Sequence, residues 1–202
     1  MAYNHYLKYA LMALKETTHN IIKEEKLEQV ENTIQTCAII AAATGVGAGM
    51  FPGGGSVVLT AASVAAIWGM YVKINKVLGI SISENTLKSL ASAILTNIVA
   101  GAGAYIVALA ATAIISLIPG LHFLAVPAEA MIAYIAVFAS GILYIKFLTK
   151  LFHAKGGFDI DNSGDDIDPL LRDVIRETDI RSVISETKNS YDQDKKDGNI
   201  KK

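Results

Sequence analysis

The middle of this sequence almost lacks charge. No charged residue occurs between Asn32 and Val72, and none occurs between Ser89 and Ala128. A helix at the surface of a soluble domain needs a polar face to meet water, so uncharged runs of this length exclude ordinary surface helices. They indicate helices that lie in lipid or in a deep protein interior. The single cysteine, Cys37, excludes an intrachain disulfide.

Recognisable catalytic, nucleotide and metal motifs are also missing. There is no phosphate-binding loop, and the four histidines are too far apart in sequence to indicate a zinc site. A net charge of −1 without a basic cluster excludes a nucleic-acid footprint. Asp159–Gly164 begins like a calcium loop, but its twelfth position is Leu170 instead of a bidentate Glu, which favours a solvated acidic linker. We expect no enzyme, no cofactor and no metal.

What the sequence does contain is two apolar helical hairpins. The first pairs Thr33–Met50 with Ser56–Val72, and the second pairs Ser89–Ile118 with a helix from Pro127 to Phe152. At about 1.5 Å per residue the first pair reaches about 26 Å, the lower limit for crossing a bilayer. Residues that cannot continue a helix predict the hairpin turns: Pro52, Gly53, Gly54, Gly55, Pro119 and Gly120.

Small residues indicate where these helices approach one another. Gly45 and Gly49 form a GxxxG pair, which lets two backbones pack closely in lipid or only loosens the adjacent turn. Gly101 and Gly103 mark a bend in the long third segment. The same seams would suit association between copies of the chain, so a homo-oligomer is one expected partner.

Lysines and aromatic residues predict the orientation. Lysines lie between the two hairpins and after the fourth helix, whereas the hairpin turns carry none, so four crossings with both termini in the cytoplasm satisfy the positive-inside rule. The expected location is the bacterial inner membrane. A first hairpin that enters one leaflet and returns fits the same pattern. The predicted interface anchors are Trp68, Tyr71, Lys73, Lys76 and Lys146.

Charged ends flank this apolar middle and suggest three regions. Residues 1–31 are expected to form an amphipathic helical segment without a cleaved signal, broken around Thr17–Asn20. Residues 32–152 hold the double hairpin. Residues 153–202 form an acidic tail with one amphipathic helix at about 168–188, and the last dozen residues are expected to be disordered.

The order of these features resembles the bacterial YcjF-like family of GTPase-associated hydrophobic domains. The resemblance covers roughly residues 36–152. It implies an all-helical membrane domain that is often fused to, or encoded beside, Era-like or dynamin-like GTPases. This chain contains no GTPase domain, so such a partner would act in trans. The resemblance rests on Pro52-Gly53, Met70-Tyr71, Lys76, Gly79, Ile118-Pro119-Gly120 and Gly141.

The sequence therefore predicts an all-α integral membrane protein with cytosolic helical ends. One hypothesis is a non-enzymatic adaptor whose ends bring a soluble partner, such as a GTPase, to the lipid bilayer. A second is a pore-forming or bacteriocin/immunity-type protein, because apolar hairpins also suit helices that insert and associate. A third is a soluble helical domain that buries its own hairpins.

Overall fold

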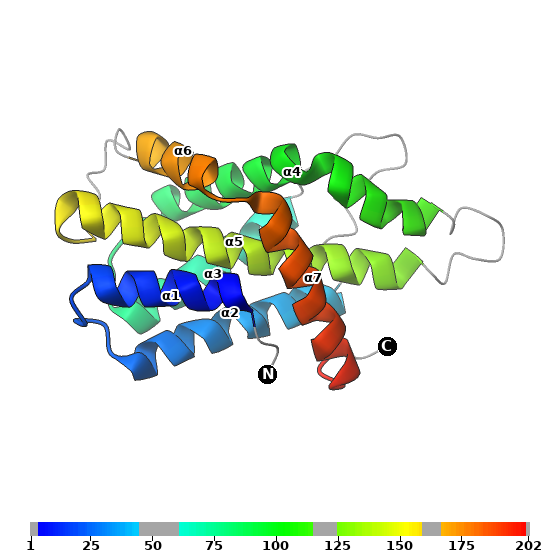
Figure 1. Cartoon of the computed structure of the whole chain (residues 1–202), viewed down its shortest axis with the longest axis horizontal. Helices are drawn as coiled ribbons and strands as arrows, with labels where there is room; N and C mark the ends of the chain where they lie inside the picture. Colours follow the sequence, from blue (N-terminus) through cyan, green and yellow to red (C-terminus); the bar gives the residue numbers. More distant parts are fainter. Residues whose placement is uncertain (1–3, 45–60, 115–124, 159–166, 201–202) are drawn as a thin grey trace.

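The described part of the chain is built from α-helices. The computed structural model describes residues 4–44, 61–114, 125–158 and 167–200. Within these residues there are seven helices and no strand (Figure 1), which confirms the all-α class. The helices are α1 (His5–Thr17), α2 (Glu24–Thr44), α3 (Ala61–Leu78), α4 (Glu84–Ile114), α5 (Ala125–Lys155), α6 (Ile167–Glu177) and α7 (Ile180–Lys196).

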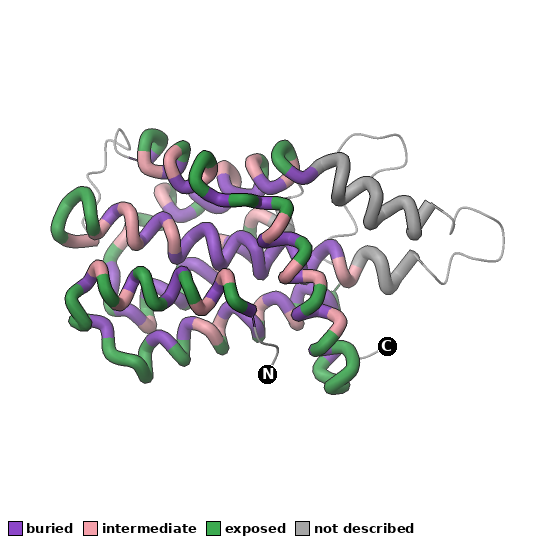
Figure 2. The backbone as a smooth tube through the Cα atoms, viewed as in Figure 1, coloured by how far each residue is buried: buried purple, intermediate pink, exposed green. Residues whose placement is uncertain are grey.

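Helix α5 is the centre of the bundle and contacts each of the other six helices (Figure 1). Its segment Ala130–Lys155 is the one stretch among the described residues that is long and apolar enough to cross a membrane. In the structure, 89% of its most apolar window is buried inside the protein (Figure 2). Core helices of soluble proteins pass the same test of length and composition. Four membrane crossings therefore remain a prediction.

Amphipathic helices cover this core because their apolar residues recur at helical spacing. Helix α1 buries Leu7, Leu11 and Leu14 against the bundle. Helix α7 buries Val183 and Tyr191 in the same way and crosses the bundle obliquely in Figure 1. The charged ends of the chain thus pack on the apolar middle in the structure.

The predicted break in the N-terminal segment is confirmed. Helix α1 ends at Thr17, and the hydroxyl of Thr18 donates to the carbonyl oxygen of Leu14 at 2.8 Å. His19 and Asn20 then adopt left-handed backbone angles, with φ of 50° and 60°, which a continuing right-handed helix excludes.

Helix α2 runs without interruption across the boundary expected between residues 31 and 32. It begins with the acidic Glu24 and Glu25, which suit the positive end of the helix dipole, and continues to Thr44. Val30 and Ile34, both fully buried, lie on the same face on either side of that boundary. One rigid element therefore joins the charged N-terminal segment to the apolar middle.

The tail contains two helices where one was expected at about 168–188. Helix α6 ends at Glu177, and the side chain of Asp179 caps α7 by accepting from the backbone N–H of Ser182 at 3.1 Å. The expectation of disorder over the last dozen residues was wrong, because α7 continues to Lys196. Asp194, within that stretch, is completely buried.

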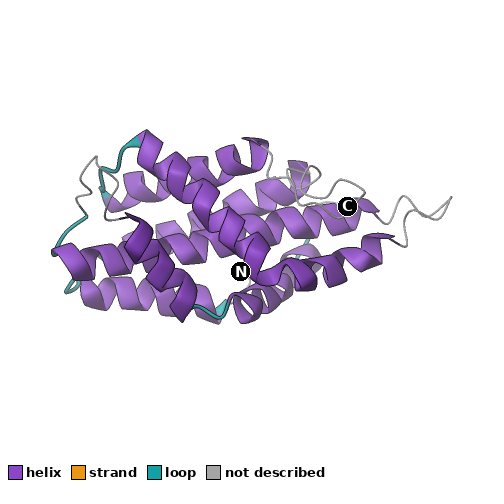
Figure 3. Cartoon of the chain, turned by 90° about the horizontal axis from the view of Figure 1, so that it is seen from above, coloured by secondary structure: helices purple, strands orange, loops and turns teal. Residues whose placement is uncertain are grey.

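The longest helices form a projecting hairpin. Each of α4 and α5 has 31 residues, about 46 Å of helix. The C-terminal end of α4 and the N-terminal end of α5 extend beyond the other helices in two perpendicular views (Figures 1 and 3). Helix α5 begins at Ala125, two residues before the expected start at Pro127. The predicted turn residues and first glycine pair lie outside the described residues: Pro52, Gly53, Gly54, Gly55, Pro119, Gly120, Gly45 and Gly49.

Candidate functional site: the central helix and its cover

Charge is scarce along the α4–α5 hairpin away from its base: between Lys88, near the start of α4, and Lys146 on α5, the one charged residue in the sequence is Glu129. The lysines of the apolar middle belong to the opposite end of the bundle. Lys73 and Lys76 lie in the last part of α3, Lys88 lies near the start of α4, and Lys146 lies in the last third of α5. The molecule is therefore polarised along its length, with a charged base and a tip that carries a single charged residue, Glu129.

An aromatic pair joins α3 to α5 in the interior. The rings of Tyr71 and Tyr144 stack with centroids 3.9 Å apart. The hydroxyl of Tyr144 donates to Oδ1 of Asn75 at 2.6 Å, and the hydroxyl of Tyr71 donates to the carbonyl oxygen of Ser140 at 3.1 Å. Tyr71, expected as an interface anchor, is fully buried inside the bundle. Its position in this structure is that of a core residue with a satisfied hydroxyl.

The other predicted anchors lie in different surroundings. Trp68 is half-buried, and the ammonium group of Lys88 lies 4.8 Å from the centre of its ring. Lys73 and Lys76 are exposed on α3. Lys146 faces α6, where its ammonium group donates to Oγ1 of Thr178 at 2.9 Å. These five residues therefore do not share one environment in the structure.

The core also contains polar groups without partners. Within the described residues, Nδ2 of Asn75, Oγ of Ser140 and Nε1 of Trp68 are buried and have no hydrogen-bond partner. A buried donor or acceptor left unpaired costs about 1–3 kcal/mol. The packing of α3 against α5 is therefore less stable than its apolar area implies.

A buried carboxylate fastens the C-terminal helix to the core. Asp194 on α7 is completely buried and accepts from the hydroxyl of Tyr134 on α5 at 2.7 Å. It also accepts from Nε2 of Gln35 on α2 at 2.8 Å and from Nδ2 of Asn199 at 3.0 Å. This cluster ties three helices together through one side chain. Sequence reasoning missed it, because Asp194 lies in a stretch that is otherwise polar.

Two glycines allow close helix packing. A Cβ atom at Gly101 on α4 would lie 3.2 Å from Cδ1 of Ile180 on α7, so α7 rests against the predicted bend. The contact is tighter at Gly141 on α5, where a Cβ atom would lie 2.8 Å from Cγ2 of Ile34 on α2. Gly141 is thus the closest described approach of a glycine to a neighbouring helix. The side-chain surroundings of Gly103 lie outside the described residues.

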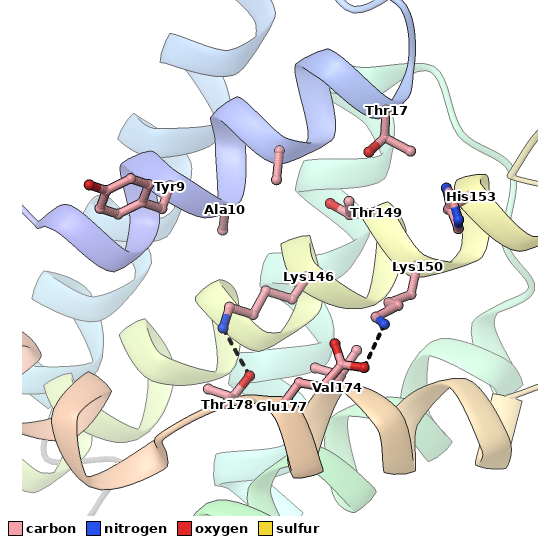
Figure 4. A pocket seen from close by; sticks show the side chains of 11 residues that line it. Tyr9, Ala10, Thr17, Lys146, Thr149, Lys150, His153, Val174, Glu177 and Thr178 are labelled. Carbon is pink, nitrogen blue, oxygen red and sulfur yellow. Dashed lines mark hydrogen bonds and ion pairs between the residues drawn. The ribbon is translucent and has the colours of Figure 1, made fainter.

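A groove of about 470 Å³ lies between α1, α5 and α6 (Figure 4). Its α1 wall consists of Tyr9, Ala10, Ala13 and Thr17, and its α5 wall consists of Lys146, Thr149, Lys150 and His153. The α6 side contributes Val174, Glu177 and Thr178. Figure 4 shows both lysines pointing from α5 toward α6.

An exposed ion pair closes the α6 side of this groove. The ammonium group of Lys150 lies 2.8 Å from Oε1 of Glu177. The hydrogen bond from Lys150, followed by the charges of Lys150 and Arg176, lowers the pKa of the Glu177 carboxyl. The carboxylate of Glu177 is therefore favoured; it is hydrogen-bonded to Lys150, and its charge also acts on Lys146.

The described residues hold no group of three or more His, Cys, Asp or Glu side chains placed to hold a metal ion. The calcium-loop-like segment Asp159–Gly164 lies outside them. Comparison with protein-family models, with curated proteins and with solved structures finds no match to this chain. The arguments for function therefore rest on the polarity of the molecule, the packing of α5 and the groove.

Proposed function

We propose that this chain is a non-enzymatic membrane adaptor. The tip of the α4–α5 hairpin enters the lipid bilayer, and the charged base holds α1, α6 and α7 on the aqueous side. The observation that carries the proposal is the coincidence of two features at one end of the molecule. The end that projects beyond the other helices is also the end where charge is scarcest, because Glu129 near the start of α5 is the one charged residue in the sequence between Lys88 and Lys146.

The length of the tip favours insertion into one leaflet. Residues 103–114 of α4 amount to about 18 Å of helix, close to half of a hydrocarbon core of about 30 Å. Four complete crossings would instead require α5 to leave its six neighbours.

The partner in this proposal is a soluble protein, and the family resemblance makes a GTPase the first candidate. The outward face of α1 supports an adaptor role, because Tyr9 is 70% exposed and Met12 is 56% exposed. Both are apolar side chains that a partner would cover. Deleting residues 1–31 or 159–202 would also remove the cover of the core, so substitutions on this face are the cleaner test.

Membrane entry is tested by flotation with vesicles of phosphatidylglycerol and phosphatidylcholine. We expect Leu109→Lys, in the tip, to weaken vesicle binding by about 100-fold, because a lysine in hydrocarbon costs about 2.5–3.5 kcal/mol. The matched control is Val72→Lys, since Val72 is 38% exposed on α3, away from the tip. Equal flotation of the two variants would contradict the proposal.

A second candidate function, pore formation, is favoured by the burial of α5 within a cover of amphipathic helices. The apolar helix α5 would pass into lipid if the covering helices α1, α6 and α7 moved away from it. A conducting pore also needs a polar stripe, and the polar residues of α4 support it less. Thr96 and Asn97 both direct their side chains back to carbonyl oxygens of α4, at 2.8 Å each. Release of a trapped dye from vesicles at protein concentrations that give full flotation would favour the pore over the adaptor.

A further inference from the structure

We propose that the groove between α1, α5 and α6 is a binding site for an anionic amphiphile, a molecule with one apolar chain and a terminal carboxylate or phosphate. This inference is independent of membrane entry by the tip. The groove belongs to the charged base, whereas the tip lies at the opposite end of the molecule. It rests on the shape of the groove, its apolar wall and its excess of cationic groups.

The α1 wall provides room for an apolar chain. Ala10 and Ala13 have no side-chain atoms beyond Cβ, so they leave open space over α5 where larger residues would close it. The aromatic side chain of Tyr9 lies farther along the same wall in Figure 4. A volume of about 470 Å³ falls in the range typical of small-molecule sites, about 300–1,000 Å³.

The α5 wall favours an anion. Lys146, Lys150 and His153 line it, and Glu177 is the one carboxylate among the lining residues. Lys150 uses that carboxylate, whereas within the described residues Lys146 donates to the neutral hydroxyl of Thr178. An ammonium group has three donors, so Lys146 retains capacity for a charged acceptor. A hydrogen bond between ionised groups is about twice as strong as one between neutral groups.

The existing ion pair shows the geometry that a ligand would use. Glu177 places its carboxylate 2.8 Å from Lys150, one helical turn along α5 from Lys146. A ligand carboxylate or phosphate bound to Lys146 would lie beside this pair, with its chain directed along the small residues of α1. A neutral amphiphile would gain the apolar contacts without the charge-assisted bond.

The test is calorimetric titration of the full-length protein with decanoate, decyl phosphate and decanol. We expect saturable binding of both anions and at least tenfold weaker binding of decanol. Lys146→Met should weaken decanoate binding about tenfold, whereas Lys196→Met, at an exposed lysine at the end of α7, should not change it. Ala13→Phe should abolish binding by filling the groove, whereas Met12→Phe, on the adjacent exposed position of α1, should preserve it.

Vesicle flotation of the Ala13→Phe variant distinguishes two sources of the anion. Reduced binding to phosphatidylglycerol vesicles assigns the site to a lipid headgroup, and unchanged flotation assigns it to a free amphiphile. Equal affinities for decanoate and decanol, or unchanged decanoate binding by Ala13→Phe, would overturn the proposal. Failure of membrane entry gives a different pattern, because wild-type protein that does not float would still bind decanoate.

Discussion

Gly141 on α5 carries a hydrogen atom in place of a side chain, and this sets how closely α2 packs against α5. Its missing side chain lets α2 approach α5 so closely that a Cβ atom at this position would lie only 2.8 Å from Cγ2 of Ile34. We expect Gly141→Ala to destabilise the protein by about 1–3 kcal/mol, because the added methyl overpacks the interface. Urea unfolding followed by circular dichroism measures the change.

Gly69 is the matched control, since it also lies within a helix and a Cβ atom there meets nothing within 4 Å. Gly69→Ala should stabilise the protein by about 0.5–1 kcal/mol through helix propensity. If both variants shifted stability in the same direction, the close approach of α2 and α5 would be refuted.

Tyr134 supports the buried carboxylate of Asp194. Its replacement by Phe removes one donor and leaves Oδ2 of Asp194 without that bond in the interior. We expect a loss of about 1–3 kcal/mol in the free energy of unfolding, the usual cost of an unpaired buried acceptor. Tyr9→Phe, at a tyrosine that is 70% exposed, should change stability by less than about 0.5 kcal/mol. Comparable losses in the two variants would argue against the cluster.

At the scale of single residues, the sequence indicates a position only where a residue type has one dominant structural meaning. Gly101 was identified as a special position, and the structure places it against Ile180. Asp194 was not identified, because the identity of the residue alone does not distinguish a buried aspartate from a solvated one. The signal was its register: Val183, Thr187, Ser190 and Asp194 recur every three or four residues on the buried face of α7.

The start of α7 is sensitive to acid at the level of a whole element. Hydrogen bonds from the side chain and then the backbone N–H of Ser182 lower the pKa of the Asp179 carboxyl. A depressed folded-state pKa contributes stability that is present above the unfolded value of about 3.9 and is lost as the pH falls through the folded value. We therefore expect α7 to detach more readily below about pH 4.

Asp179→Asn separates capping from titration. Asn still caps a helix but does not ionise, so the variant should show a weaker dependence of unfolding on pH between about pH 5 and 2. Urea midpoints at several pH values, compared with those of the wild type, measure this dependence. An unchanged profile would show that Asp179 does not govern the acid sensitivity of the element.

Helical class and the N-terminal break followed from apolar spacing, but the division of the tail into α6 and α7 did not. Leu171 and Val174 on one side and Val183 and Ile184 on the other fall on opposite faces of a single continuous helix, so the sequence does record a change of phase between α6 and α7. The division also depends on the cap at Asp179 and on the change of direction that lets α7 cross the bundle (Figure 1). Tertiary packing fixes that direction, and the local sequence does not reveal it.

At the scale of the whole molecule, the covering helices α1, α6 and α7 distinguish the two proposed functions. They stay packed on α5 if only the tip enters the bilayer, and they separate from α5 if the bundle opens. The side chains of Asn4, the N-cap of α1, and Ser190 on α7 are hydrogen-bonded at 3.1 Å. Cysteines at these positions in a Cys37→Ser background, oxidised to a disulfide cross-link, would hold the start of α1 to α7. We expect unchanged vesicle flotation, because only the tip needs to enter the bilayer. A large loss of flotation after cross-linking would instead favour opening of the bundle, as pore formation requires.

The arrangement of the helices around α5 was the feature least predictable from the sequence. Uncharged runs predict burial but do not distinguish lipid from protein as the surroundings, and α5 shows why. Its segment Ala130–Lys155 has the composition of a membrane span, yet six helices surround it. Those helices come from the whole length of the chain, and α1 and α2 are remote from α5 in sequence, so no local pattern records these contacts.

The polarised shape has a mechanical consequence for a membrane. A hairpin tip that occupies one leaflet adds area to that leaflet alone, while the broad base remains outside. Many copies on the same side would give the two monolayers different areas. A flat bilayer relieves this difference by curving so that the monolayer that holds the protein is on the convex side. We expect the protein to bind small, tightly curved vesicles more strongly than large ones, and to accumulate at curved regions of a membrane.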